Sequence, residues 1–429
     1  MDFQLLSSIE APPLHIIILA LPVLAAAAFY SFLALLHLIA PKPRAVLPSE
    51  RTYLTTTPDG KTVTRQLPCW HDRWLAERHK SETIENVTPN GPGPVIADTG
   101  DIEPAELRMS VVIPAYNEED RILPTLKEAV EYLDATYGRK SQSQSQSQSH
   151  ETTEATTTTT TTTNSSSKKP GGGWTHRRHL KNAPREDISG YEILIVNDGS
   201  TDKTVQVALD FARDHGLHDI LRIVTLQRNR GKGGGVTHGL RHVRGEYAVF
   251  ADADGATRFA DLARLVDGCD EVADGCYRGV AIGSRGHLVG SEAVVRRSLL
   301  RNFLMRSFHL VLTILTPPAT SRVRDTQCGF KLFTRAALPH IVPYMHMEGW
   351  IFDIEMLMLA ESAPAVPVLG SDGAAIGSSP GIKVAEVPVD WHEVGGSKLH
   401  VVRDSIAMAI GLFILRTSWM MGVYRRRLT

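Results

Sequence analysis

The chain has 429 residues, a formal net charge of −1 and 42% hydrophobic residues. A chain of this length can bury a large core in one big domain or two modest ones, and its near-neutral charge gives no global field that would attract nucleic acid. The four cysteines (Cys69, Cys269, Cys276 and Cys328) are scattered, without a Cys-x-x-Cys pair. This spacing predicts reduced thiols in a cytosol-facing protein and excludes a dense disulfide framework.

The first predicted element is a membrane-spanning helix at residues 14–40. This stretch contains no Asp, Glu, Lys or Arg, and a helix of its length crosses a hydrocarbon core about 30 Å thick. A cleaved signal peptide is the alternative, but its apolar region is usually shorter and preceded by positive charge. Here acidic residues precede the stretch, and basic residues follow at positions 42, 44 and 51. The positive-inside rule therefore predicts a short lumenal N-terminus at 1–13 and a cytosolic location for the rest.

Residues 41–107 form a predicted juxtamembrane region of mixed, turn-rich composition. β-prone residues flank a Pro-Asp-Gly turn at 58–60, which predicts a β-hairpin over residues 53–67. The segment at 69–74 is aromatic and charged. A binding site is one interpretation of this segment; we favour packing against the main domain.

A catalytic domain is predicted over residues 108–402, where short apolar strands alternate with helices. Strands are expected at 108–114, 191–196, 221–226 and 247–251, and helices at 118–137, 202–215 and 236–243. This alternation predicts an α/β fold with a parallel sheet covered on both faces. Ligands of such sheets bind at the carboxyl ends of the strands. A later helix is expected from residue 349, with carboxylates at 353 and 355 on different faces, one of them structural.

Two insertions interrupt the domain. Residues 138–184 hold a Ser-Gln repeat, a Thr run and a glycine-rich stretch. They bury too little apolar surface to offset the entropy of ordering, so a disordered insertion is expected. Residues 363–381 are rich in Pro, Gly and Ser and are expected to form another loop.

Two segments are expected to lie at the membrane surface. Residues 296–315 mix apolar residues with four arginines, which is too charged to span a bilayer but suits the headgroup layer; a core helix is the alternative. Residues 406–423 are apolar apart from Arg416 and precede three further arginines. We expect a second interfacial or bundle helix in the C-terminal segment 403–429, with a membrane span as the weaker alternative.

Polar motifs follow the first three strands. They are Pro-Ala-Tyr-Asn-Glu-Glu at 114–119, Asn-Asp-Gly-Ser-Thr-Asp at 197–202 and Asn-Arg-Gly-Lys-Gly-Gly-Gly at 229–235. A tyrosine ring can stack on a base, Asp198 can accept the imide N–H of uracil, and a flexible glycine-rich loop with cations suits phosphates. Turns and helix N-caps explain each motif equally well on its own. Their meeting at one edge of the sheet favours a ligand site.

An Asp-x-Asp pair follows the fourth strand, at Asp252 and Asp254. Mg²⁺ and Mn²⁺ prefer oxygen ligands and often share their shell between one or two carboxylates and substrate phosphates. On its own the pair is weak evidence for a metal site, because roughly one Asp-x-Asp arises by chance in a chain of this length. Together with the three other motifs it predicts a nucleotide-sugar transferase with Mg²⁺ or Mn²⁺ at Asp252 and Asp254.

These motifs resemble glycosyltransferase family 2. Residues 111–118, 196–200 and 251–255 carry the resemblance, and residues 325–333 and 395–399 are most similar to the branch that glucosylates dolichyl phosphate. The resemblance covers residues 109–402 and the N-terminal anchor. It implies a GT-A (Rossmann-like) α/β fold and inversion at the anomeric carbon. It also implies UDP-glucose as donor, dolichyl phosphate as acceptor, a divalent metal and the endoplasmic reticulum membrane as location.

The resemblance also implies roles for individual residues. The nucleotide sugar would contact Pro114, Ala115, Tyr116, Glu118, Asp198, Lys232, Asp252 and Ala253. The acceptor phosphate would contact Arg285, Ser397 and Lys398, and the catalytic residues would be Asp325, Arg285 and Lys398. Some relatives carry an arginine shortly before the motif at 395–399, where the nearest candidate in this chain is His392.

The acceptor explains why cations dominate this set. A phosphate monoester with a second pKa of about 6 is largely dianionic at neutral pH, so it needs no strong general base. Lys232 and the metal would neutralise the leaving UDP, while Arg285 and Lys398 hold the attacking phosphate. For Asp325 we favour orientation of a sugar hydroxyl over action as a base.

Two other functions stay open at this stage. A mannosyltransferase or another monosaccharide transferase of the same fold would differ in its donor. A membrane-anchored protein that binds nucleotide sugars without catalysis is the alternative from another class. The sequence fixes neither the preferred metal nor the oligomeric state.

Overall fold

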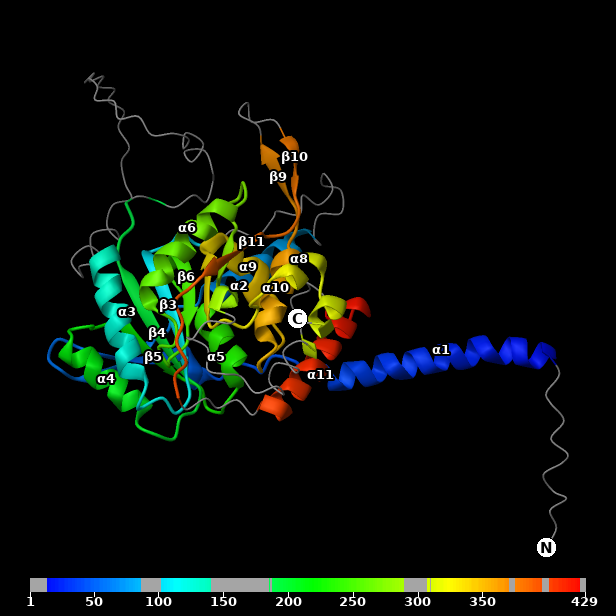
Figure 1. Ribbon diagram of the computed structural model, residues 1–429, viewed down its shortest axis with the longest axis horizontal. Coiled ribbons are helices and arrows are strands. Elements are labelled where there is room, and N and C mark those ends of the chain that lie inside the picture. Colours follow the sequence, from blue (N-terminus) through cyan, green and yellow to red (C-terminus); the bar gives the residue numbers. More distant parts are fainter. Residues whose placement is uncertain are drawn as a thin grey trace, which may run out of the picture.

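The computed structural model describes residues 14–85, 102–139, 185, 187–288, 307–308, 310–369, 375–395 and 401–424. Residues 140–184 of the predicted insertion, most of the segment at 296–315, and Ser397 and Lys398 lie outside the described residues. The four cysteines are free thiols, as expected. One large sheet flanked by helices forms the body of the molecule, and α1 extends away from it (Figure 1).

A nine-stranded sheet is ordered β11-β7-β8-β6-β3-β4-β5-β1-β2. Its strands are β1 (Thr52–Thr56), β2 (Thr62–Gln66), β3 (Leu107–Ala115), β4 (Tyr191–Asn197), β5 (Leu221–Thr225), β6 (Gly245–Ala251), β7 (Val280–Ser284), β8 (Phe330–Thr334) and β11 (Val384–Pro388). The helices are α1 (Leu14–Ile39), α2 (Trp70–Glu85), α3 (Ile122–Tyr137), α4 (Thr204–Asp214), α5 (Gly231–Leu240), α6 (Leu262–Val272), α8 (Pro318–Arg322), α9 (Leu338–Ile341), α10 (Phe352–Glu361) and α11 (Val401–Met420). The four predicted strands are confirmed as β3 to β6, and the predicted hairpin as β1–β2.

The sheet is mixed, so the expectation of a parallel sheet is wrong at β8 and β1. Strands β3 to β6 are parallel, but β8 lies antiparallel between β6 and β7. At the other edge, β1 pairs antiparallel with β5. Strand β1 belongs to the β1–β2 hairpin, which needs no crossover connection, and β8 runs antiparallel to β7 although α8 lies between them in the chain.

Helices cover both faces of the sheet, as predicted, because side chains alternate along its strands. Val111 and Ile113 of β3 belong to the hydrophobic layer that contains α3, α4 and α6. Val112 belongs to the opposite layer, with α2, α5, α9, α10 and α11. The central strands are therefore buried on both sides.

Helix α5 begins at Gly231, five residues earlier than predicted. The glycine-rich stretch expected to be a flexible loop forms the first turns of this helix. Its glycines allow close approach: a Cβ on Gly233 would lie 2.5 Å from the Cβ of Phe352, and one on Gly239 would lie 2.4 Å from a methyl of Val112. Close packing of α5 against β3 and α10 thus outweighs the low helix propensity of its glycines.

Residues 363–381 are not only a loop, as the sequence predicted. They contain an antiparallel hairpin of β9 (Val366–Leu369) and β10 (Ala375–Ser379), which projects from the domain (Figure 1). Val366, Val368 and Ile376 supply the β propensity that the Pro, Gly and Ser content obscured.

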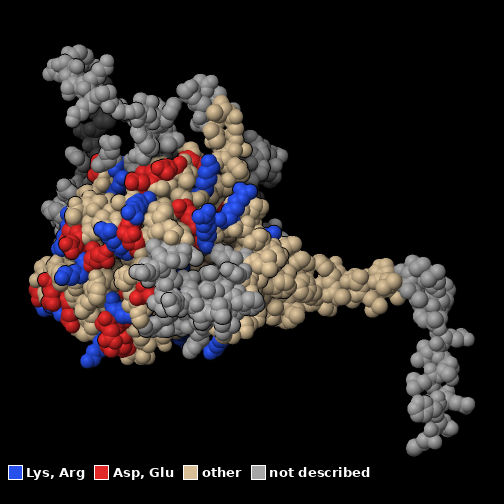
Figure 2. Space-filling model, in the orientation of Figure 1, with Lys and Arg blue, Asp and Glu red and all other residues tan. Residues whose placement is uncertain are grey.

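Helices α1 and α11 meet beside the domain. The segment Ala20–Ile39 is long and apolar enough to cross a membrane, and Figure 2 shows no charged side chain on the described part of α1. Helix α11 buries Leu412 and Leu415 in the core and exposes Ile406, Ile410 and Phe413. An exposed apolar side on a helix packed against the domain fits the predicted interfacial helix.

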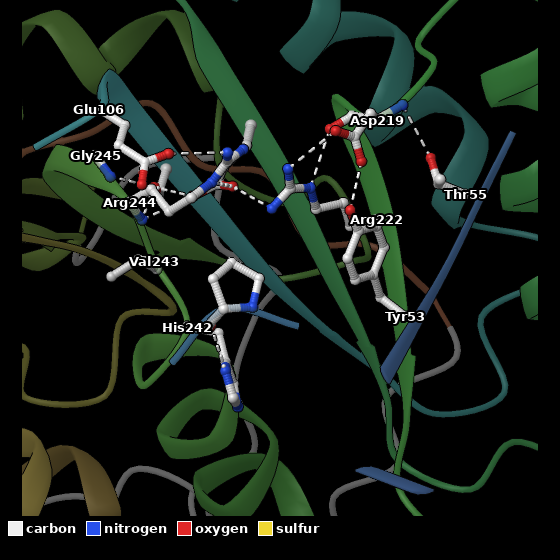
Figure 3. A network of polar contacts seen from close by, with 12 residues as sticks. Tyr53, Thr55, Glu106, Asp219, Arg222, His242, Val243, Arg244 and Gly245 are labelled. Atoms are coloured by element: carbon white, nitrogen blue, oxygen red, sulfur yellow. Dashed lines mark hydrogen bonds and ion pairs between the residues drawn. The ribbon is translucent and has the colours of Figure 1, made fainter. Parts of the chain in front are cut away.

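A buried polar network joins the hairpin β1–β2 to the central strands (Figure 3). Glu192 of β4 binds Arg244 at 2.8 Å and Arg222 at 3.3 Å. The guanidinium of Arg222 lies over the ring of Tyr53, whose hydroxyl donates to Asp219 at 2.5 Å. Burial alone would raise the pKa of Glu192, but Arg244 and Arg222 lower this pKa to about 2.

We expect Glu192→Gln to lower the free energy of unfolding by about 3 kcal/mol, because it leaves two guanidinium groups without their buried countercharge. Since the pKa of Glu192 is lower in the folded than in the unfolded protein, its contribution is present above the ordinary glutamate pKa and is lost as pH falls toward 2. Urea unfolding followed by tryptophan fluorescence measures both effects. Asp59→Asn, in the exposed hairpin turn, is the control and should leave the midpoint unchanged. Equal shifts in the two variants would contradict this account.

Candidate active site

The carboxyl ends of β3, β4, β5 and β6 lie at one edge of the sheet, as their parallel pairing requires. Pro114 and Ala115 are the last residues of β3. The amide of Asp198 donates to the carbonyl of Ala115 at 2.8 Å, and the amide of Asn117 donates to Ser200 Oγ at 2.9 Å. The structure therefore brings the predicted motifs together.

The loop after β3 turns sharply at Asn117. This residue has a φ of 54°, a left-handed conformation that asparagine tolerates better than most residues. Tyr116 before it is 39% exposed, as a ring that stacks on a base needs to be. Glu118 after it accepts two 2.8 Å hydrogen bonds from the guanidinium of Arg121. A ribose hydroxyl would therefore meet a carboxylate that is already engaged.

Asp198 holds the start of α5. Its carboxylate is buried and accepts the amides of Arg230 at 2.7 Å and Gly231 at 2.8 Å. The N-cap alternative is therefore wrong for Asp198: the N-cap residues of α4 and α5 are Lys203 and Arg230, and Asp198 binds the start of α5 from the neighbouring loop. Burial raises the pKa of Asp198 to about 6, against the lowering effect of these two hydrogen bonds. A carboxylate oxygen accepts more than one bond, so these two bonds leave capacity for a ligand N–H.

Lys232 and Asp252 form the centre of the site. The Nζ of Lys232 lies 2.6 Å from Oδ1 of Asp252. Burial opposes its charge, but the carboxylates of Asp252, Asp353 and Asp254 raise the pKa of Lys232. The carboxylate of Asp252 packs on Gly329, where a Cβ would lie 1.9 Å from Oδ2. Only glycine at position 329 permits this placement.

The turn after Asp252 is held by two hydrogen bonds. Thr125 Oγ1 donates to the carbonyl of buried Ala253 at 2.9 Å, and Asp254 Oδ1 accepts the amide of Ala256 at 3.1 Å. Both acids therefore project from one short, ordered loop. Two carboxylates on such a loop are a suitable ligand set for a hard divalent cation.

A second ion pair joins Arg285, which follows β7, to Asp325. The guanidinium donates to both carboxylate oxygens, at 2.7 and 2.8 Å, and lies over the ring of Trp391. Burial opposes both charges, yet the pairing raises the pKa of Arg285 and lowers that of Asp325. An ionised carboxylate held by arginine is a poor general base. This geometry favours the orienting role expected for Asp325.

The loop that carries Trp391 lies beside the Asp252 turn. Trp391 forms a bridge with Thr257, and the amide of His392 donates to a carbonyl of the turn at 2.9 Å. The acceptor side thus approaches the predicted metal ligands. Ser397 and Lys398 lie outside the described residues, so their contact with the acceptor stays a prediction.

A fully buried ion pair that the sequence reasoning missed lies behind the site. Lys331 of β8 contacts Asp353 of α10 and donates to the carbonyl of Cys328 at 2.6 Å. Helix α10 carries the two carboxylates expected from the sequence, Asp353 and Glu355. Glu355 is structural, because it accepts the amides of residues 346 and 347. A lysine within an apolar strand is a usable signal, since burial penalises a charge unless it is paired.

Glu386 of β11 is a second residue that the sequence reasoning missed. It accepts Ser284 Oγ at 2.6 Å and the amide of Asp325 at 3.1 Å. Glu386 therefore supports the Arg285–Asp325 pair from behind. No sequence signal identifies it, because it is one acid on an edge strand whose neighbours are defined only by the fold.

Another group of potential metal ligands lies at the start of α2. The ligand atoms of Cys69, His71 and Asp72 are within 4.8 Å of one another, but burial raises the pKa of the Cys69 thiol to about 11, which disfavours the thiolate that a metal needs. Trp70 is buried and donates to the carbonyl of Leu240 at 2.8 Å. The packing interpretation of residues 69–74 is confirmed.

Comparison with known proteins identifies the family. A sequence profile described as Glycosyl transferase family 2 matches residues 177–311. The dolichyl-phosphate beta-glucosyltransferase of Saccharomyces cerevisiae is 34% identical over 403 residues, which cover 92% of this chain and 91% of that protein. The chain belongs to the dolichyl-phosphate β-glucosyltransferases. The human protein of that name is 32% identical over 319 residues, 74% of this chain and 78% of its own.

The GT-A fold expected for such a dolichyl-phosphate β-glucosyltransferase is confirmed. Among solved structures, glucosyl-3-phosphoglycerate synthase from Mycobacterium tuberculosis covers 72% of this chain and 80% of its own, with 15% identity and a TM-score of 0.38. That similarity is too low to bear on the site.

We expect Lys232→Met to bind Mn²⁺ more tightly than the unchanged protein when no nucleotide is present. The ammonium no longer competes with the cation for Asp252, so affinity should rise roughly threefold to tenfold. Electron paramagnetic resonance of free Mn²⁺ measures the change. Lys127→Met, on the exposed side of α3, is the matched control. Unchanged or weaker Mn²⁺ binding by Lys232→Met would contradict competition at Asp252.

Proposed function

We propose that this protein transfers glucose from UDP-glucose to dolichyl phosphate and inverts the anomeric carbon. The observation that carries the proposal is the Lys232–Asp252 ion pair beside Asp254, in a chain of this family. Lys232 and Asp252 neutralise each other. A bound cation could take the place of Lys232 beside Asp252, and the diphosphate could take the place of Asp252 beside Lys232.

The donor would lie across the loops after β3, β4 and β5. The exposed ring of Tyr116 would stack on the uracil, and Asp198 would accept the imide N–H. Lys232 would bind the diphosphate, with the backbone of Pro114 and Ala115 and the engaged carboxylate of Glu118 lining the nucleoside.

Asp252 and Asp254 would hold a divalent cation, Mg²⁺ or Mn²⁺. The fit rests on the donor set, two carboxylates on one turn, and on the Gly329 surface that fixes one of them. When bound, the cation neutralises charge on the leaving UDP. The protein itself contributes the Lys232 ammonium to the same charge.

The acceptor phosphate would bind Arg285, with Ser397 and Lys398 as further contacts. Its dianion needs no general base, so the task of the protein is to align two anions. Asp325 would keep Arg285 oriented while the phosphate is bound. The lowered pKa of Asp325 keeps its carboxylate ionised, which suits it to accept hydrogen bonds from a sugar hydroxyl.

A membrane location agrees with a lipid acceptor. The apolar helix α1 and the exposed side of α11 support attachment to a bilayer. We propose the endoplasmic reticulum membrane, with residues 1–13 lumenal and the catalytic domain cytosolic. Leu310 and Ile314, exposed near α8, add apolar surface.

Asp254→Ala should lower glucosylation of dolichyl phosphate roughly 100-fold or more, because the divalent cation loses a ligand where charge develops. The assay incubates the full-length membrane protein with dolichyl phosphate and either labelled UDP-glucose or labelled GDP-mannose. Asp210→Asn, on the surface of α4, is the control and should keep full activity. Undiminished transfer by a folded Asp254→Ala protein, or transfer from GDP-mannose alone, would overturn the proposal.

UDP binding should weaken as pH falls from 7 to 5. The pKa of Asp198 is raised to about 6, so its carboxylate is mostly ionised at pH 7 and mostly protonated at pH 5, where acceptance of the uracil N–H is lost. We expect a roughly tenfold loss of affinity beyond that of Asp198→Asn, which lacks this titration. Calorimetry at constant Mg²⁺ measures both proteins. Identical pH profiles would remove Asp198 from the uracil site.

A further inference from the structure

Glu348 joins the segment after the membrane anchor to the start of α5. Its carboxylate accepts Nε and a terminal nitrogen of Arg230 at 2.8 and 2.6 Å. The same carboxylate contacts the guanidinium of Arg44 at 3.1 Å. Arg44 lies five residues beyond the end of α1, so one acid links the anchor's linker to the loop that carries Lys232.

Further contacts strengthen this junction. Arg230 donates to the carbonyl of Arg44 at 2.9 Å, and Arg44 donates to the carbonyl of Asn229 at 3.1 Å. The carbonyl of Glu348 accepts the amide of Gly234 at 3.1 Å. The first turn of α5 is therefore held by Asp198 on one side and by Glu348 with Arg44 on the other.

The segment that carries Glu348 is itself fixed. Glu355, fully buried, accepts the amides of His346 and Met347. The His346 ring stacks on Tyr424 after α11, and the Tyr424 hydroxyl donates to the carbonyl of Pro41 at 2.6 Å. Residues 345–348 thus contact both membrane-associated parts of the chain, the linker after α1 and the end of α11.

This geometry has a consequence for ligand affinity. When a ligand must order a loop in order to bind, the free energy spent on ordering weakens its affinity. The contacts of Glu348 and Arg44 order residues 229–232 before any ligand arrives. Without them, part of that ordering falls to the diphosphate. Neither side chain needs to touch the ligand for this effect.

We propose that Glu348 is a positioning residue for the donor diphosphate and that Arg44, in the linker after α1, helps Glu348 to hold the loop before α5. The proposal rests on the proposed role of Lys232 at the diphosphate. It assigns to the linker an effect on donor affinity, separate from its role in holding the protein at the membrane.

The test compares Glu348→Gln and Arg44→Ala with Arg51→Ala in the full-length, membrane-inserted protein. Arg51 is the matched control: it lies in the same region and is half-exposed like Arg44, but pairs with Asp72 of α2. We expect the first two variants to raise the Kd for UDP and the KM for UDP-glucose roughly threefold to tenfold. The kcat and the KM for dolichyl phosphate should stay within about twofold. Arg44→Lys should restore part of the affinity, and the double variant should be no weaker than the weaker single one.

UDP affinities equal to those of the unchanged protein would overturn the inference. A loss confined to kcat or thermal stability would overturn it too, because that pattern reports structure and not donor positioning. If the unchanged protein binds UDP but does not glucosylate dolichyl phosphate, the proposed function fails, while the UDP affinities still decide the role of Glu348. Strictly additive losses in the double variant would show that Arg44 and Glu348 do not act through one contact, which also counts against it.

Discussion

The site depends on one constraint: α5 must begin directly at the carboxyl edge of the sheet. The buried carboxylate of Asp198 meets this constraint, because it binds the amides of Arg230 and Gly231, the residue before the helix and the first residue in it. Glycines at 233 and 239 let the helix approach α10 and β3 more closely than any larger residue would. Lys232, in the first turn, then reaches Asp252 at the end of β6. Backbone hydrogen bonds and close packing together place the Lys232 ammonium beside Asp252.

Charges in the described part of the site are neutralised in pairs. Lys232 pairs with Asp252, Arg285 with Asp325, and Arg121 with Glu118. Lys232 and Arg285, which the proposed function assigns to phosphate contacts, are each held by a carboxylate. At the Lys232–Asp252 pair, binding of a diphosphate and its cation would exchange the partners, which avoids leaving a half-buried charge without a counterion. The same principle explains the pair of Lys331 and Asp353 behind the site, where neither charge reaches solvent.

The sequence predicts much of this arrangement, and the parts that it misses have a common physical cause. Strands β3 to β6 and the polar motifs after them follow from hydrophobic pattern and turn chemistry, which are local. The start of α5 was misplaced because glycine opposes helix formation locally, whereas contacts with Val112 and Phe352 favour it. Likewise β8 breaks the parallel pattern because its pairing depends on distant strands. Glu348 and Glu386 escaped notice because their partners are far away in the chain.

The short connection between α1 and the 3-10 turn at Pro48–Arg51 would also limit where the proposed reaction takes place. Eight residues lie between Ile39 and Pro48, and a fully extended chain of that length spans at most about 28 Å. Arg44, in the middle of this connection, is held by contacts with Glu348 and with Asn229 and Arg230 of the β5–α5 loop, which shortens the free part of the connection. If α1 crosses a bilayer, as we propose, this edge of the sheet would stay at a nearly constant height above the lipid headgroups. A long polyprenyl acceptor could then present its phosphate to the proposed site without leaving the bilayer, whereas a water-soluble enzyme would have to extract it.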